Sequence, residues 1–237
     1  MRPDIYFHVG AGRAASRWLQ EQVFPRFRGV RYIPRNRFRQ SAGIIATGGD
    51  LPVLVSRQLG YREFTPSVSW FARAAPTARP ILVLRRHDGW LRSVYLREIK
   101  ELRYVPFESF IDFERDAGVR PQASALFRER IRVLEEHFEH RPLVLFFDRL
   151  VANPQGFVRA IADYVGASYD ETEIAFRPVN RSLATGNTGF CGRWAGAGRS
   201  RGGNAPSTPR AAGFGCGRDG SPGTSAWVSD AWRRSGS

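Results

Sequence analysis

The chain has 237 residues, which is enough for one domain with a sizeable core and an additional tail. Its net charge is +14, and Lys100 is the only lysine among 36 basic residues. This charge favours anionic ligands such as nucleotide phosphates, sulfated glycans or nucleic acid, and a solvated Arg-rich surface is the alternative. No apolar run approaches the roughly 18 residues of a membrane span. Because Asp4 and His8 interrupt any signal-like pattern, we expect a cytoplasmic protein without a transmembrane segment.

Five apolar, β-rich runs alternate with helical periods along the first three quarters of the chain. The helical periods include 127–138 and a helix that begins at Asn153-Pro154 and ends at Gly166. Strands that alternate with helices predict an α/β fold, a three-layer sandwich around a central, mostly parallel sheet. The expected strands are Ile5–Val9, Val30–Ile33, Val53–Val55, Ile81–Leu84 and Leu143–Phe147, with the first of them central.

The first strand leads into Gly10-Ala11-Gly12, and we expect helix from Ala14 onward. Backbone amides at such a helix start favour a phosphate, although a plain tight turn is the alternative. The pattern also matches the short dinucleotide fingerprint, but the acidic residue expected about 20 positions later is missing. Arg35 and Arg37 stand there instead and would suit the 2′-phosphate of NADP.

Two later strand-to-helix junctions carry polar residues. Arg85 ends the fourth strand and Ser93 follows eight residues later on the next helix, so both can converge on one phosphate. A solvated basic pair, Arg85-Arg86, is the alternative interpretation. Asp148 ends the fifth strand, and we interpret it as a loop or capping acid rather than a catalytic one.

The composition changes near Leu183. Residues 183–237 hold 13 of the 24 glycines, one Leu and one Val, and no Ile, Lys or Glu. Such a segment buries too little apolar surface to offset its ordering entropy. We therefore predict a domain over 1–182 and a Gly/Arg/Ser-rich tail over 183–237, either disordered or the product of a shifted reading frame. Cys191 and Cys216 lie in this tail and form no metal-ligand set, so we expect no metal site.

Together the three junctions resemble the sulfotransferase superfamily, especially its bacterial branch, over about residues 4–182. That family opens with an apolar strand, His-x-Gly, two residues, Lys-Thr-Gly-Thr-Thr and an apolar pair; the matching positions here are His8, Gly10, 13–17 and 18–19. Its 3′-phosphate element is an Arg followed by a Ser eight residues later, as in Arg85 and Ser93. Its later strand, acidic residue, Leu and Asn/Asp-Pro helix look like 143–148, 150 and 153–154.

The resemblance implies a P-loop-like fold and a transfer of sulfuryl from 3′-phosphoadenosine 5′-phosphosulfate (PAPS) to a hydroxyl acceptor such as a carbohydrate. Arg13 stands at the catalytic lysine position, and Ala14 and Arg17 replace threonines of the family loop. Arginine keeps the charge but differs from lysine in reach and shape. The implied cofactor-binding residues are Gly10, Gly12, Arg13, Ala15, Ser16, Arg17, Arg85 and Ser93.

Three alternatives stay open at the level of the sequence. They are a nucleotide-binding descendant without activity, an NADP-dependent oxidoreductase that uses Arg35, and a basic nucleic-acid binder, for which no recognised module appears. The general base of a sulfotransferase is not assigned, because His87 and Asp50 are candidates without motif support. We interpret His8 as a residue that supports the loop.

Overall fold

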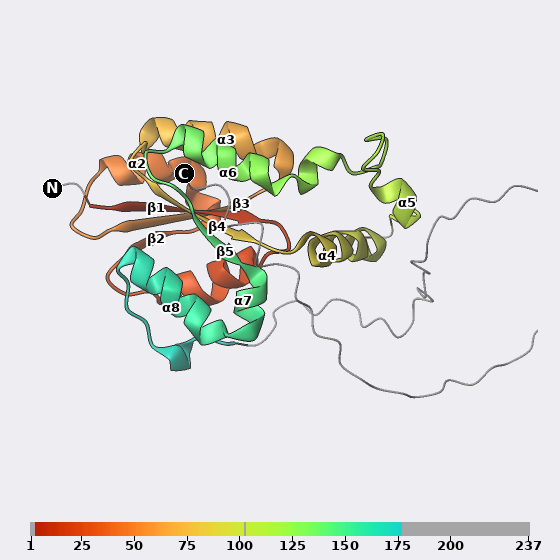
Figure 1. The fold of residues 1–237 in the computed structure, drawn as a ribbon. Helices are drawn as coiled ribbons and strands as arrows, with labels where there is room; N and C mark the ends of the chain where they lie inside the picture. Colours follow the sequence, from red (N-terminus) through yellow and green to blue (C-terminus); the bar gives the residue numbers. More distant parts are fainter. Residues whose placement is uncertain (1–2, 102, 177–237) are drawn as a thin grey trace, which may run out of the picture. The chain divides into compact units, whose positions relative to one another are not determined.

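The computed structural model describes residues 3–101 and 103–176, and its centre is a five-stranded parallel sheet (Figure 1). The strand order is β2-β3-β1-β4-β5, so β1 is central, between β3 and β4. All five predicted strands and the α/β fold class are confirmed. The strands are β1 (Ile5–Ala11), β2 (Arg31–Ile33), β3 (Val53–Leu59), β4 (Arg79–Leu84) and β5 (Leu143–Phe146). The predicted boundary at 182/183 and the tail lie outside the described residues.

The two helices predicted in detail from periodicity and caps are also confirmed. One is α6 (Phe127–His137); the other, α8 (Pro154–Val165), begins after Asn153, whose side chain accepts a hydrogen bond from the Gly156 amide at 2.8 Å, and ends at Gly166 with φ of 68°. The other α-helices are α1 (Ser16–Trp18), α2 (Ser41–Ala46), α3 (Tyr61–Ala74), α4 (His87–Lys100), α5 (Phe107–Phe110) and α7 (Phe147–Ala152). Shorter elements are η1 (Leu19–Val23, a π-helix) and the 3-10 helices η2 (Phe24–Arg26), η3 (Arg35–Gln40), η4 (Gln122–Ala125) and η5 (Glu171–Glu173).

Helices cover both faces of the sheet. In Figure 1, α2, α3 and α6 lie on one face, and α7 and α8 lie on the other. Strand side chains alternate between the two layers because their period is two residues. In β4, Leu82 and Leu84 belong to the apolar cluster under α3 and α6, whereas Ile81 and Val83 belong to the cluster under α8. This alternation explains why the central strands are apolar throughout.

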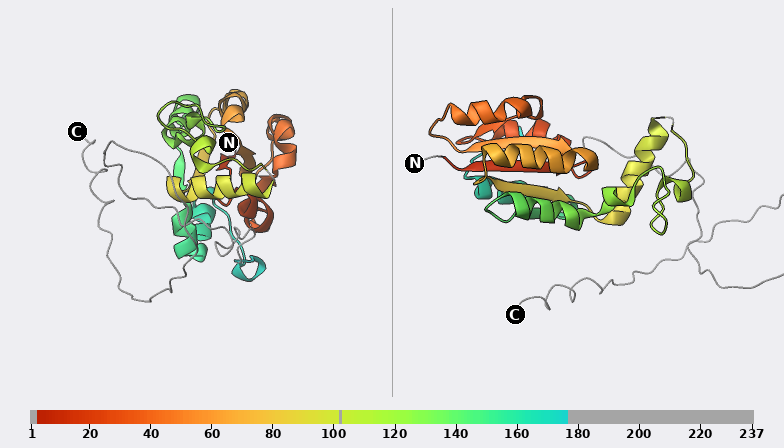
Figure 2. Two further views of the ribbon diagram at one scale, coloured as in Figure 1. Left: turned by 90° about the vertical axis from the view of Figure 1, so that its right-hand side faces the viewer. Right: turned by 90° about the horizontal axis from the view of Figure 1, so that it is seen from above.

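Helices α4 and α5 extend beyond the carboxyl ends of the strands (Figure 2, right). The aromatic side chains of α5 pack on α4, with the rings of Tyr95 and Phe110 centred 5.2 Å apart. Within the described ranges, no helix is long and apolar enough to span a bilayer. Because α4 follows β4 along the chain, the start of α4 forms one wall at the sheet edge where β4 ends.

A buried polar network lies beneath the chain that follows β1. His8 is fully buried, and its Nδ1 is 2.8 Å from the hydroxyl of Ser56 on β3. The side-chain amide of Gln20 donates to the same hydroxyl at 2.9 Å. Burial lowers the pKa of His8 to about 3. The imidazole is consequently neutral in the folded protein at physiological pH and ties β1 to β3.

This pKa predicts a pH dependence of folding. Below its ordinary value near 6.5, His8 takes up a proton in the unfolded chain but not in the folded one, so the free energy of unfolding falls as the pH drops from about 6.5 toward 3. The contribution is on the order of 1 kcal/mol per pH unit. Urea titrations between pH 7.5 and 5 should show a steeper loss in the wild type than in His8→Asn.

The variant His140→Asn, at a half-buried histidine outside this network, controls for the removal of one histidine. It should lose stability with falling pH as the wild type does. Identical pH profiles for the wild type and His8→Asn would contradict the assignment of a buried neutral imidazole.

Candidate functional site

A pocket of about 840 Å³ lies at the carboxyl edge of the sheet. Residues at or just after the ends of all five strands line it: Arg35 after β2, Gln58 in β3, Arg13 after β1, Arg85 after β4 and Phe147 after β5. In open parallel sheets, ligands bind in the crevice outside the carboxyl ends of the strands. The fold therefore places this pocket where an α/β protein binds its ligand.

The turn after β1 has an unusual backbone. Arg13 and Ala15 have φ of 70° and 60°, in the left-handed region that side chains with a Cβ disfavour. These two residues interrupt the helical path, so helix begins at Ser16 and not at Ala14, and the prediction of helix from Ala14 is wrong by two residues. The Ser16 hydroxyl donates to the carbonyl of Ala11 at 3.0 Å and closes the turn.

Gly10 makes room for that closure. A Cβ on Gly10 would lie 2.2 Å from the Ser16 hydroxyl oxygen, which no side chain tolerates. The glycine that the sequence indicated as phosphate-binding thus has a visible packing role. It lets the helical segment approach the end of β1.

The junction between β4 and α4 contacts this turn directly. The Nε of Arg13 donates to the hydroxyl of Ser93 at 2.8 Å, and the Arg85 guanidinium donates to the carbonyl of Arg13 at 3.4 Å. The indole of Trp90 donates to the Gly12 carbonyl at 3.0 Å. The structure therefore brings Arg13, Ser16, Arg85 and Ser93 to one pocket, although the two stretches are far apart in sequence.

Aromatic packing and a glycine hold Arg85 in place. Its guanidinium carbon lies 4.5 Å from the centre of the Phe147 ring. A Cβ on Gly89, in the first turn of α4, would lie 3.1 Å from the Arg85 Nε. Arg85 is thus confined between α4 and α7, with no carboxylate in a salt bridge to it among the described residues.

The pocket is strongly cationic. Its basic residues outnumber its single carboxylate, Glu101, and that carboxylate is bound to Arg97 at 2.7 Å. Burial, and then the nearby charge of Arg97, lowers the pKa of Arg13. Burial, and then the charge of Arg13, lowers the pKa of Arg85. An anion bound between these two guanidinium groups would raise the pKa of both arginines again.

Other residues singled out in the sequence lie elsewhere or are engaged. Arg17 lines the pocket, but its exposed side chain pairs with Glu21 at 2.9 Å. Asp50 precedes β3 and so lies at the amino end of the sheet, away from the pocket. Asp148 is in the first turn of α7.

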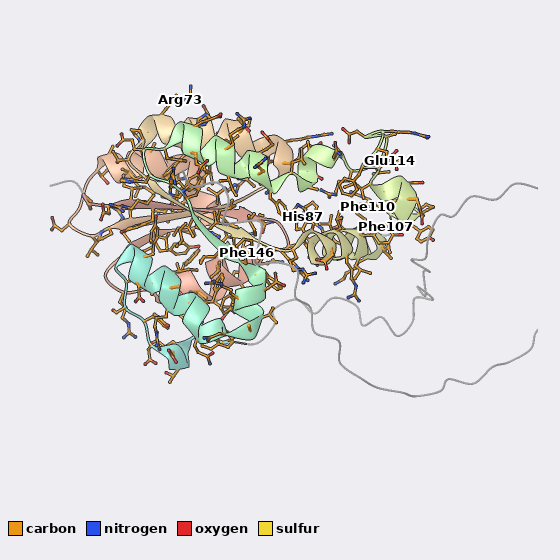
Figure 3. All side chains as sticks on the ribbon, in the orientation of Figure 1. Arg73, His87, Phe107, Phe110, Glu114 and Phe146 are labelled. Carbon is orange, nitrogen blue, oxygen red and sulfur yellow. The ribbon has the colours of Figure 1, made fainter. Side chains whose placement is uncertain are left out.

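His87 begins α4 (Figure 3), and its ring stacks on Phe127 at 4.5 Å. Its Nε2 is 2.9 Å from the carbonyl of Ala125, and His87 is not among the residues that line the pocket. The structure therefore gives neither His87 nor Asp50 the position of a general base at Arg13.

Several pocket residues were not identified from the sequence. Gln58 lies in a continuation of β3 past the predicted end at Val55, where polar residues mask the strand. Arg97 and Lys100 lie on the last turn of α4, and their spacing from Ser93 by about one and two helical turns could have identified them. Trp18 lines the pocket as well, and its indole N–H donates a hydrogen bond to the Ala175 carbonyl at 2.9 Å.

No protein-family model matches this sequence, and no curated protein does either. Among solved structures, a sulfotransferase from Alicyclobacillus acidocaldarius is similar with a TM-score of 0.55 and 16% identity, over 75% of this chain and 87% of that one. The described residues share the α/β fold of that sulfotransferase. At this identity the likeness shows the fold alone.

Two weaker likenesses are to a mouse sulfotransferase in complex with PAP and to the sulfotransferase domain of a Synechococcus olefin synthase. The mouse structure gives a TM-score of 0.48 and 17% identity, over 73% of this chain and 62% of that one. The Synechococcus domain gives 0.44 and 12%, over 77% and 80%.

The left-handed turn predicts that Ala15→Gly stabilises the protein. Glycine adopts φ of 60° without the steric cost of a Cβ, so the free energy of unfolding should rise by about 1 kcal/mol in chemical denaturation. Ala14→Gly, at a neighbour that is not left-handed, is the matched control and should destabilise. A loss of stability in Ala15→Gly equal to that in Ala14→Gly would contradict the described turn.

Proposed function

We propose that this protein is a sulfotransferase that transfers a sulfuryl group from PAPS to a hydroxyl acceptor. The observation that carries the proposal is the contact between the β1 turn and the β4–α4 junction. Arg13 donates a hydrogen bond to the Ser93 hydroxyl, and Arg85 donates one to the Arg13 carbonyl. PAPS carries anionic groups at its 3′ and 5′ positions, and these two junctions supply a cationic element for each.

The residues of the pocket fit such a nucleotide. Arg85 and Ser93 can bind a 3′-phosphate through a charge-assisted guanidinium contact and a hydroxyl. Arg13, with the amides and hydroxyl of the Gly12–Ser16 turn, can hold the 5′-phosphosulfate. The ring of Trp18, next to the ring of Phe176 with centroids 6.1 Å apart, offers an apolar wall for a base.

In the proposed reaction, the acceptor oxygen forms a bond to sulfur while the bond between sulfur and the bridging oxygen breaks. The sulfuryl group becomes a sulfate ester of the acceptor, and the electron pair of the broken bond stays on the 5′-phosphate of 3′,5′-phosphoadenosine. The proton of the acceptor hydroxyl passes to water. Arg13 and the turn amides stabilise the charge that develops on the bridging oxygen, which is electrostatic rather than covalent catalysis.

The position of Gln58 gives it a role beside the turn. Its side-chain nitrogen would lie 3.6 Å from a Cβ built on Gly12, so the amide is next to the phosphosulfate position. An amide does not take up a proton at neutral pH, but its carbonyl can accept a hydrogen bond from the acceptor hydroxyl. Glu101 is a poor base because its hydrogen bond from Arg97 lowers its pKa.

The strand order weighs against the oxidoreductase alternative. In a dinucleotide-binding sheet of order 3-2-1-4-5-6, the second strand lies next to the first. Here β3 occupies that place and β2 is at the edge. Arg35 does line the pocket. It follows the edge strand β2 and not the strand next to β1, so its position does not support an NADP 2′-phosphate site.

Arg85→Ala tests the proposal. It should weaken binding of 3′,5′-phosphoadenosine by about 1.5–3 kcal/mol, the usual worth of a charge-assisted hydrogen bond. It should weaken binding of adenosine 5′-phosphosulfate, which lacks the 3′-phosphate, far less. Isothermal titration with both ligands measures the difference.

Arg86→Ala is the matched control, because Arg86 is adjacent but exposed and paired with Asp88 at 3.0 Å. It should leave both affinities within about twofold of the wild type. Equal losses for the two ligands in Arg85→Ala, or the same loss in Arg86→Ala, would remove the support for a 3′-phosphate site.

A further inference from the structure

A group of arginines extends from the pocket along η3 and the end of β3. We call Arg35, Arg37, Arg39 and Arg57 the η3 arginine strip. Arg35 lines the pocket, so the strip begins at the proposed transfer site. The ten ion pairs of the described residues include none of these four side chains. Four positive charges therefore stand together without carboxylate partners in the part of the chain that the structure describes.

Aromatic rings and a backbone carbonyl hold two guanidinium groups of the strip, those of Arg57 and Arg39. The Arg57 guanidinium donates to the Arg35 carbonyl at 3.3 Å and lies 5.9 Å from the centre of the Phe38 ring. The Phe38 ring contacts Trp70, with centroids 5.1 Å apart, and the Arg39 guanidinium lies 5.5 Å from the centre of the Trp70 ring. These contacts form an unbroken chain from the pocket mouth to Arg39.

This mode of support leaves the charges available to a ligand. A guanidinium that lies over a ring keeps most of its N–H groups available, and these match the oxygens of a carboxylate or sulfate group. Arginines supported in this way lose less side-chain entropy when an anion binds. The strip is thus prepared for several anionic groups rather than for one.

The strip also lies on the side from which an acceptor can reach Arg13. Arg35 lines the same pocket as Arg13 and Ser16 of the β1 turn. An acceptor held by Arg35 at the pocket mouth would therefore bring a hydroxyl close to the turn. Arg85 and Ser93, which we assign to the nucleotide, lie on the opposite side of β1, after β4.

We propose that the acceptor is an acidic oligosaccharide or polysaccharide, whose carboxylate or sulfate groups bind the η3 arginine strip while one of its hydroxyls faces Arg13. This inference rests on the proposed function and names its substrate class. A nucleic acid is the less favoured polyanion, because single-stranded nucleic acids bind where bases can stack on exposed aromatic rings. Here Phe38 is buried and Arg39 covers Trp70.

The test measures binding of three labelled hexamers to the full chain by fluorescence anisotropy, with 3′,5′-phosphoadenosine present. The probes are a heparin hexasaccharide, cellohexaose, which is neutral, and hexauridylate. The heparin probe should bind at least tenfold more tightly than the other two, and its affinity should fall steeply with salt. Tighter binding of hexauridylate, or equal binding of cellohexaose, would overturn the proposal.

The double variant R37S/R39S removes two strip charges and touches no residue assigned to the nucleotide. Its affinity for the heparin probe should fall about tenfold or more, as expected for two charge-assisted contacts. The control R132S/R159S removes the same charge from exposed arginines on α6 and α8 and should change the affinity by less than about twofold. Equal losses in both double variants would mean nonspecific charge attraction and would overturn the proposal.

Titration of each variant with 3′,5′-phosphoadenosine separates this inference from the proposed function. R37S/R39S should bind the nucleotide as the wild type does. Absent nucleotide binding in the wild type would refute the proposed function, whereas intact nucleotide binding with an unselective strip would refute only the acidic acceptor.

Discussion

The hydrogen bond from Arg13 to Ser93, 2.8 Å long, joins the two parts of the chain that the pocket needs. It exists because β1 and β4 are neighbours in the sheet, with Gly10 opposite Val83 in the register of the pair. Parallel strands bring their carboxyl ends to the same edge, so the turn after β1 and the start of α4 meet there. The pocket, its charge and the position of Arg85 all depend on this pairing.

Three arginines of this domain that have no carboxylate partner among the described residues are held by aromatic rings. Phe147 supports Arg85, Phe38 supports Arg57, and Phe64 supports the buried Arg130 at 5.3 Å. Burial lowers the pKa of Arg130 to about 10. A carboxylate partner would neutralise an arginine, whereas a ring orients it and leaves its charge in place. Arg85 thus keeps its positive charge in the pocket at the carboxyl edge of the sheet.

The fold was largely predictable from the sequence because its strands are apolar on both faces. Ile5–Val9 and Ile81–Leu84 read as buried strands, since side chains from two helical layers cover them. The ends were less predictable. β3 continues through Ser56, Arg57 and Gln58, and these polar residues look like a loop until the buried partner His8 is known.

The candidate site was predictable where chemistry follows a strand end. Arg85 and Ser93 could be paired because eight residues across a strand-to-helix junction return to the same side of the helix start. The start of the helix after β1 could not, because left-handed φ at Arg13 and Ala15 has no signal in residues other than glycine. Arg97 and Lys100 enter the pocket only through the length of α4, which tertiary packing determines.

A crystal structure of the full chain with 3′,5′-phosphoadenosine would show whether the two junctions bind the two phosphates. The 5′-phosphate should lie at the Gly12–Ser16 turn, and the 3′-phosphate about 3 Å from the Arg85 guanidinium and the Ser93 hydroxyl. A nucleotide bound with neither phosphate at Arg85, or at another edge of the sheet, would contradict this arrangement.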